Sequence, residues 1–199
     1  MIVITDPQFI SSEADILNAL FCEGLEILHL RKPDSTLVKL IELVSKIDEQ
    51  FHSRIMIHSH YELLNSFQLK GLHFTEKSKH LLGYYESVEC KKSLVVHELT
   101  ELKNTWNSID YVFLSPLFPS ISKAGYSKQW DFEELKSELS IKHNFNVVAL
   151  GGITLNNVKM VKELGFNDFA ILGSVWEPVK SGYSIQQVID VFTRFKNGY

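Results

Sequence analysis

The chain has 199 residues, of which 45% are hydrophobic and 22% charged, and its formal net charge is −4. These values are typical of a globular domain that buries a full core without disulfide staples. The acidic balance argues against a nucleic-acid partner, which usually meets a basic face. No apolar run approaches the roughly 18 residues that a membrane span needs, so we expect no membrane partner.

The cysteines and the first residues favour a reducing compartment. Cys22 and Cys90 have neither metal-binding nor redox spacing, so we predict that both are buried as small apolar side chains. The opening run Ile2–Thr5 lacks the basic stretch and the longer apolar stretch of a secretion signal. We therefore expect a cytoplasmic protein.

Short apolar runs alternate with helix-like segments along the whole chain. Eight runs are predicted as β-strands: Ile2–Thr5, Glu26–Arg31, Arg54–His58, Gly71–Phe74, Ser93–His97, Asp110–Ser115, Asn146–Leu150 and Asp168–Leu172. Their spacing is typical of βα units. We predict an α/β fold with a single domain over residues 1–199, in which the strands close into a (β/α)8 TIM barrel. An open, doubly wound sheet is the alternative.

The segments between the strands carry the apolar periodicity of amphipathic helices. Helices are predicted over Ser12–Cys22, Thr36–Phe51, Asp131–Leu139, Leu155–Leu164 and Ile185–Phe195. Thr154 is the expected N-cap of the fourth helix, and Gly165 is the expected residue just past its end. The segment Glu76–Lys92 has a poor helical pattern, so we expect a short helix or mostly loop there.

Two glycine-containing turns follow the last two strands. Gly151 and Gly152 come directly after one strand, and Gly173 and Ser174 come after the next. Glycine lets the backbone approach a ligand closely, and the N–H groups that open a helix attract anions. In a (β/α)8 barrel a phosphate site commonly lies after strands 7 and 8. We predict that these four residues bind the phosphate of a small molecule; the alternative is plain turns and helix caps.

Four successive strands carry a histidine near their C-terminal ends, where barrels place their active sites. These residues are His29, His58, His73 and His97, and His60 follows closely. His58 and His60 have the i, i+2 spacing of two metal ligands on a strand. No carboxylate accompanies them there, so we predict no metal site. His29 and His58 are predicted to contact substrate.

Arg31 lies two residues after His29 and so faces the same way from the strand. Its planar guanidinium suits a phosphate or a carboxylate. We predict that Arg31 binds the substrate; the alternative is an ion pair with Asp34 or Asp6.

The ends of the fifth and sixth strands add a proton carrier and a polar loop. A histidine side chain ordinarily titrates near neutrality, which suits His97 to proton transfer. Ser115 ends the sixth strand, and the proline-stiffened loop after it carries Ser120, Ser122 and Lys123. We predict that these four residues contact an anionic substrate; the alternative is an exposed loop with incidental serines.

These motifs together resemble the thiamine phosphate synthase/TenI family along nearly the whole chain. The matching segments are IVITD (2–6), GLEILHLRKPD (24–34), IMIHSHYELL (55–64), GLHFTEKS (71–78), VVHELTEL (95–102), DYVFLSPLFPSISKAG (110–125), VVALGGITLNNV (147–158) and GFNDFAILGSVW (165–176). The resemblance implies a (β/α)8 barrel that acts on a thiazole phosphate in thiamine biosynthesis. It also implies a homodimer.

The family holds two activities, and the chain departs from the first of them. Synthases join hydroxymethylpyrimidine diphosphate to a thiazole phosphate with Mg2+, whereas TenI-type members are thiazole tautomerases that need no metal. Synthases carry Asn-Asp where this chain has His58-Ser59, and a second Mg2+-binding Asp where Ser78 stands. They also carry Gln and Lys at the positions of His29 and Pro33. Mg2+ prefers carboxylate oxygens, so both expected ligands are missing.

The resemblance to TenI-type members places the catalytic acid/base at His97, in the segment VHELTE. We therefore predict a tautomerase that isomerises a carboxythiazole phosphate and needs no cofactor. The first alternative is a synthase with an altered Mg2+ site, supported by the Ser120–Lys123 loop, in which Asp34 or Glu76 replaces a lost carboxylate. The others are a non-catalytic binder of a thiazole or thiamine phosphate and a different phosphate-binding barrel.

Overall fold

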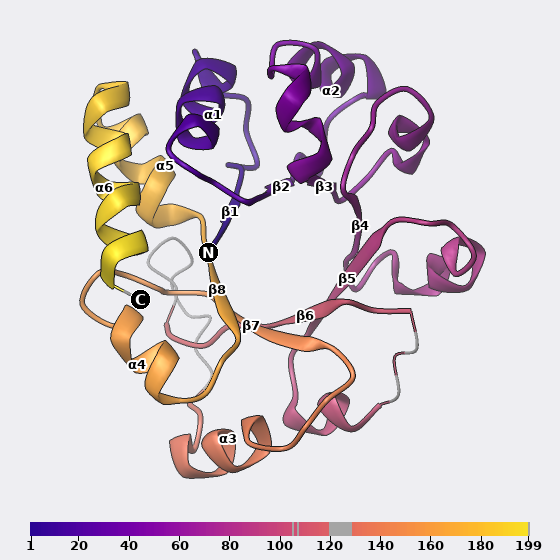
Figure 1. Ribbon diagram of the computed structural model, residues 1–199, viewed down its shortest axis with the longest axis vertical. Helices are drawn as coiled ribbons and strands as arrows, with labels where there is room; N and C mark the ends of the chain where they lie inside the picture. The colour runs from indigo at the N-terminus through magenta and orange to yellow at the C-terminus, as the bar shows by residue number, and fades with distance from the viewer. Residues whose placement is uncertain (105, 107, 120–128, 199) are drawn as a thin grey trace.

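Eight parallel strands close into a barrel in sequence order (Figure 1). This computed structural model describes residues 1–104, 106, 108–119 and 129–198. The strands are β1 (Ile2–Ile4), β2 (Ile27–Leu30), β3 (Ile55–Ile57), β4 (Gly71–Phe74), β5 (Lys91–Val96), β6 (Tyr111–Leu114), β7 (Asn146–Leu150) and β8 (Asp168–Ile171). Because β1 pairs with both β2 and β8, the ring has no open edge. The (β/α)8 prediction is confirmed, and the open sheet is excluded.

Helices and short turns surround the ring. The α-helices are α1 (Glu13–Cys22), α2 (Leu37–Val44), α3 (Phe132–Leu139), α4 (Val158–Glu163), α5 (Gly173–Lys180) and α6 (Ile185–Gly198). The described residues also form four 3₁₀-helices: η1 (Glu49–Arg54), η2 (Tyr61–Asn65), η3 (Lys79–Tyr85) and η4 (Leu99–Lys103). In Figure 1, α1, α5 and α6 gather on one side of the barrel. Among the described residues, no helix has both the length and the apolar character to cross a membrane.

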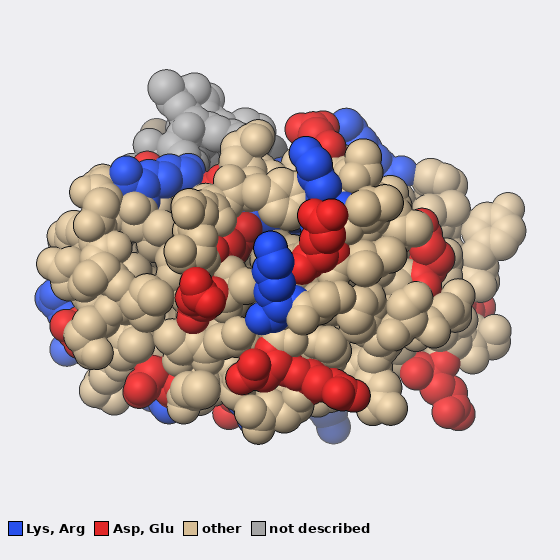
Figure 2. All heavy atoms as spheres, turned by 90° about the horizontal axis from the view of Figure 1, so that it is seen from above, with Lys and Arg blue, Asp and Glu red and all other residues tan. Residues whose placement is uncertain are grey.

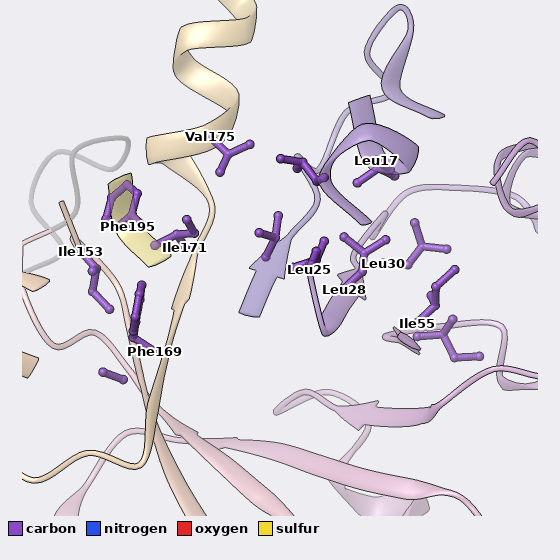
Figure 3. Packing of buried hydrophobic residues seen from close by; sticks show 14 of the residues in the cluster. Leu17, Leu25, Leu28, Leu30, Ile55, Ile153, Phe169, Ile171, Val175 and Phe195 are labelled. Atoms are coloured by element: carbon purple, nitrogen blue, oxygen red, sulfur yellow. The ribbon is translucent and has the colours of Figure 1, made fainter. Parts of the chain in front are cut away.

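Side chains along each strand point alternately toward an outer core and an inner core. Outward side chains of the strands pack under the helices, as Phe169 and Ile171 of β8 do beside Val175 of α5 and Phe195 of α6 (Figure 3). Inward side chains form a second cluster that fills the barrel: Ile2, Ile4, Met56, Tyr111, Phe113, Val148 and Ala170. Since side chains alternate along a strand, the inward positions of every strand can be read from these two clusters.

The predicted helix over Thr36–Phe51 is wrong in its second half. The α-helix ends at Val44, and a 3₁₀-helix begins only at Glu49. The side chain of Asn18 on α1 explains the break. Its Nδ2 donates to the carbonyl of Lys46 (3.0 Å), and its Oδ1 accepts from the N–H of Asp48 (2.9 Å). These backbone groups therefore bond to a neighbouring helix instead of continuing their own.

The predicted helix over Leu155–Leu164 begins three residues late, and Thr154 is not its N-cap. The helix starts at Val158 with Asn157 as N-cap. The side chain of Asn157 accepts from the N–H of Thr154 (2.8 Å) and donates to the carbonyl of Gly152 (2.9 Å), which stabilises a turn before the helix. Gly165 follows the helix with φ +96°, as expected for its position.

Two smaller expectations have different outcomes. The prediction that both cysteines are buried is wrong, because Cys22 is exposed at the end of α1 and Cys90 is half-buried. The segment Glu76–Lys92 does contain a short helix, the 3₁₀-helix η3, together with turns and the start of β5. A poor α-helical pattern is consistent with the tighter 3₁₀ geometry.

Charged side chains on the surface are interspersed rather than sorted by sign. On the face shown in Figure 2, Lys and Arg lie beside Asp and Glu. Exposed pairs include Lys91 with Asp110 (2.6 Å) and Lys180 with Glu177 (3.3 Å). Such pairs contribute only about 0–1 kcal/mol each, so burial in the two cores carries most of the stability.

Candidate functional site

The C-terminal ends of the strands bring the predicted site residues to one end of the barrel. Leu28 and Leu30 face the outer core, so His29 and Arg31 face inward. Ile55 and Ile57 face outward in the same way, which turns His58 inward. The alternation therefore directs polar side chains from neighbouring strands toward the barrel axis.

Three of these histidines form one buried cluster, which we call the histidine trio (His29, His58 and His73). His29 Nδ1 lies 2.9 Å from His58 Nε2, and the rings of His58 and His73 are 4.1 Å apart between centroids. His29 is fully buried and His73 nearly so. The trio lies on inner positions of β2 and β4 and at the end of β3, so its members come from three adjacent strands.

Two further polar residues bind the trio from the barrel interior. His29 Nε2 lies 2.5 Å from the hydroxyl of Tyr111 on β6, and His73 Nδ1 lies 2.9 Å from the hydroxyl of Ser93 on β5. Our sequence interpretation missed Tyr111 and Ser93. The inward alternation of β5 and β6 was the signal that could have found them, since it places both on the same side as His29.

Burial keeps the trio neutral. Loss of hydration lowers the pKa of His73 to about 3, and the nearby charge of Arg31 adds to this shift. Desolvation also lowers the pKa values of His29 and His58 well below the ordinary range, with the neighbouring histidines as further causes. All three imidazoles therefore hold a lone pair available for a hydrogen bond or a metal at neutral pH.

His97 lies just past β5, and its ring has a defined tautomer. Its Nδ1 is 2.6 Å from the carbonyl oxygen of Ser115. A carbonyl only accepts, so Nδ1 carries the proton, and in the neutral ring Nε2 is the basic nitrogen. The side chain is 36% exposed, with Nε2 at 4.0 Å from a carboxylate oxygen of Glu76. This arrangement suits proton transfer to or from a bound ligand.

The Glu101 carboxylate holds the start of the loop that carries His97. It accepts hydrogen bonds from the backbone N–H groups of His97 (2.7 Å) and Glu98 (3.1 Å), and it pairs with Lys79 (3.1 Å). Burial raises the pKa of Glu101, but these N–H groups and Lys79 outweigh it and leave the value below its usual range. The carboxylate therefore stays ionised and positions the loop.

The first glycine turn packs against the loop after β6. Gly151 and Gly152 have φ values of +104° and +63°, which favour glycine. A Cβ atom at Gly152 would lie 2.5 Å from the carbonyl oxygen of Pro119 and 2.8 Å from Cβ of Phe118. The protein itself therefore requires glycine here. Phosphate binding at this turn stays a prediction.

The second glycine turn opens toward α5. Gly173 is the first residue of that helix, and a Cβ added there would meet, among the described residues, only Cγ of Glu177, at 4.0 Å. The hydroxyl of Ser174 donates to the carbonyl of Ile153 (2.7 Å), which joins the two turns. The N–H groups that open a helix have no partner within it, so this turn keeps donors for an anion.

Some residues considered for the site bond to other parts of the protein, and others lie outside the described residues. Asp6 pairs with Lys180 of α5 (2.5 Å) rather than with Arg31, so one alternative partner of Arg31 is engaged elsewhere. His60 binds the carbonyl of Ser35 through Nε2 (3.0 Å) and is not part of the histidine trio. Ser120, Ser122 and Lys123 lie outside the described residues.

The described residues do not fit the Mg2+ site of a synthase. Ser78, which stands where the family carries an Asp, bonds through its hydroxyl to Tyr61 (3.1 Å) and to the N–H of Thr75 (2.8 Å). Glu76 pairs with Lys79. Within the described part of the chain, the histidine trio is the one group of three metal-ligating side chains, and it offers nitrogen rather than oxygen. Mg2+ prefers oxygen ligands, so we derive no step through it.

The structure is a closed (β/α)8 barrel in which each of the last two strands is followed by a glycine-containing turn. A sequence model of the family described as "Thiamine monophosphate synthase" matches residues 1–175. The chain therefore belongs to this family, and the resemblance seen in the sequence motifs is confirmed.

Individual relatives agree with this assignment. The chain is 22% identical to the thiamine-phosphate synthase of Dictyoglomus thermophilum, over 92% of this chain and 85% of that protein. It is 23% identical to that of Prochlorococcus marinus over 88% of this chain, but it spans only 51% of that longer relative. The solved thiamine phosphate pyrophosphorylase of Bacteroides thetaiotaomicron is 31% identical, with a TM-score of 0.80, and covers 100% of this chain and 96% of that one.

These comparisons correct the order of the predicted functions. The relatives' names support the synthase alternative, a transferase of thiamine biosynthesis, and give no support to a tautomerase as the favoured function. The sequence favours the tautomerase because both metal carboxylates are missing and His97 is present. The family match over residues 1–175 outweighs these two replaced ligands.

Proposed function

We propose that the protein is a thiamine-phosphate synthase that joins hydroxymethylpyrimidine diphosphate to a thiazole phosphate. One observation carries the proposal: the family match extends over residues 1–175, which include all eight strands and both glycine turns. In this reaction a carbon–nitrogen bond forms and the bond between the pyrimidine carbon and diphosphate breaks. Catalysis then depends mainly on positioning and on stabilising the departing anion.

The described residues have separable roles in this proposal. The backbone N–H groups at Gly173 and Ser174 hold the thiazole phosphate. Arg31 faces the barrel axis and supplies positive charge for the leaving diphosphate, whose affinity for a guanidinium is strong. His97 presents Nε2 to the site and accepts or donates one proton. A homodimer, expected from the family resemblance, stays a prediction.

One observation favours a second candidate, the thiazole tautomerase. His97 has a ring anchored by the Ser115 carbonyl and a basic Nε2 on its half-exposed side, and the carboxylates for Mg2+ are replaced by His58-Ser59 and Ser78. A tautomerase needs a positioned acid/base and no metal. Both candidates use the same phosphate-binding turns, so they differ in chemistry rather than in place.

A paired assay on the purified protein separates the two candidates. One arm measures thiamine phosphate formation from the two synthase substrates, with Mg2+, with Zn2+ and with chelator. The other arm measures isomerisation of a carboxythiazole phosphate in chelator. Metal-dependent thiamine phosphate formation supports the proposal. Isomerisation alone replaces it with the second candidate, and a protein active in neither arm overturns both.

A further inference from the structure

We propose that the histidine trio is a binding site for a transition-metal ion such as Zn2+ or Co2+. One ring nitrogen from each of His29, His58 and His73 lies within 4.8 Å of the other two. Nitrogens around a tetrahedral ion with Zn–N bonds of about 2.1 Å are roughly 3.4 Å apart. The spacing in the trio brackets this value, since one pair is already at 2.9 Å. Small ring rotations bring three donors onto one ion.

The chemistry of the donors selects the metal. Imidazole nitrogen suits Zn2+, Co2+, Ni2+ and Cu2+, whereas Mg2+ and Ca2+ require oxygen ligands. Three protein ligands leave a fourth position for water or an anion, which is the arrangement of open rather than structural zinc sites. The site is therefore distinct in ligand class from the carboxylate site of the synthases that the chain resembles.

The surroundings of the trio resemble the outer shell of a metal site. A ligating histidine usually bonds through its other ring nitrogen to a fixed polar group, which sets the ring orientation. His29 has such a partner in Tyr111 (2.5 Å), and His73 has one in Ser93 (2.9 Å). Ser93 is the register partner of His73 on the neighbouring strand β5, and Tyr111 reaches His29 from β6. Each partner therefore fixes one ring through the nitrogen to which it bonds.

His58 is the member of the trio whose second ring nitrogen has no fixed partner. Among the described residues, Nδ1 of His58 is buried without a hydrogen bond. Nε2 of the same ring lies 2.9 Å from Nδ1 of His29, so in the absence of an ion one of these two nitrogens donates a proton to the other. A metal ion between the two rings would take the place of this hydrogen bond and use both lone pairs.

The positive charge of Arg31 affects how tightly a metal ion binds to the trio. This charge acts on His58 and His73, so it opposes a bare dication at the trio. An anionic fourth ligand, such as a phosphate oxygen, offsets that repulsion and connects the metal to Arg31. We therefore expect inorganic phosphate to strengthen metal binding, and Arg31→Gln to strengthen it in the absence of phosphate.

The test is direct titration of chelator-treated protein with Co2+, followed by visible absorption and calorimetry. We expect one equivalent to bind with the intense absorption of a tetrahedral nitrogen site, and Zn2+ but not Mg2+ to displace it. His58→Asn and His73→Asn should each lower the affinity by more than about 100-fold, and Tyr111→Phe by about 10-fold. His60→Asn is the matched control, because His60 follows the same strand but bonds to Ser35.

Several outcomes would overturn the site. These are weak octahedral absorption, an affinity unchanged in His58→Asn and His73→Asn, or no tightening in Arg31→Gln. Each variant is first checked for cooperative unfolding. Where His73→Asn fails to fold, the absorption of the unaltered protein and the affinity of His58→Asn decide. No substrate enters the titration, so its result is independent of whether the protein is a synthase.

Discussion

A hydrogen bond from the ring of His97 to the Ser115 carbonyl identifies the basic nitrogen of His97, and this makes its role testable. Since Nδ1 donates to the Ser115 carbonyl (2.6 Å), Nε2 is the atom that can exchange a proton with a ligand. A glutamine at this position keeps a polar side chain but cannot shuttle a proton. We expect His97→Gln to lower turnover by about 10²–10⁴-fold in whichever arm of the paired assay is active.

We expect His97→Gln to lower turnover without weakening ligand binding. The affinity for the phosphorylated thiazole, measured by calorimetry, is expected to stay within about threefold, because the phosphate is predicted to bind at the turns after β7 and β8. His80→Gln serves as the control, since His80 is exposed on η3. Full turnover in His97→Gln would remove His97 from the mechanism, whatever the reaction proves to be.

At the scale of the elements, the two glycine turns require glycine for different reasons. Gly152 has φ +63° and lies under the backbone of Phe118 and Pro119, so any Cβ there strains the fold. Among the described residues, a Cβ at Gly173 would meet only Cγ of Glu177, so packing does not require glycine there, and we expect its lack of a side chain to matter to a ligand instead. Gly152 and Gly173 occupy similar positions after neighbouring strands, but the atoms that surround them differ.

This difference predicts opposite outcomes for two alanine substitutions. Gly152→Ala should lower the free energy of unfolding by about 1–3 kcal/mol. Gly173→Ala should leave it nearly unchanged and weaken phosphate binding. Denaturant unfolding and phosphate-ligand calorimetry measure the two effects. Gly83→Ala is the control, because a Cβ there meets no atom of the described part of the chain within 4 Å. A stable Gly152→Ala, or a Gly173→Ala with full affinity, would contradict the assignment.

The strands could be predicted from the sequence better than the helices. All eight predicted runs overlap an observed strand, although β5 begins at Lys91 rather than Ser93, because buried parallel strands are short apolar runs between polar ends. The helices were bounded less well, since their ends depend on tertiary hydrogen bonds. Asn18, on α1, bonds to the backbone just past Val44 and so ends the helix predicted over Thr36–Phe51. Asn157 stabilises the turn before α4, so that helix begins later than predicted. Neither effect is visible in local periodicity.

The site was predictable in place but not in detail. The sequence indicated which strand ends carry polar residues, and the closed barrel brings His29, His58 and His73 together. It did not indicate that Tyr111 and Ser93 bond to the trio, because contacts between strands depend on the register of those strands. The contact with the loop after β6 that requires glycine at position 152 could not be predicted for the same reason.

At the scale of the whole molecule, the neutral trio makes the metal-free fold sensitive to acid. Burial lowers the pKa of His73 to about 3, and it also lowers those of His29 and His58. In the unfolded chain a histidine titrates near pH 6.5. Below that pH the unfolded chain binds protons that the folded one does not, so the free energy of unfolding falls with pH. The stability is fully present above about pH 6.5 and is lost progressively below it.

We expect each histidine of the trio to contribute a slope of about 1.4 kcal/mol per pH unit between roughly pH 6 and 5. Denaturant unfolding in chelator over this range measures the slope, and carboxylates contribute little because most titrate at lower pH. His73→Gln should reduce the slope by about one histidine's share, even if its stability at neutral pH also changes, whereas His80→Gln should leave it unaltered. An equal slope in His73→Gln and the unaltered protein would mean that the trio takes up protons while folded, and that water reaches the barrel interior.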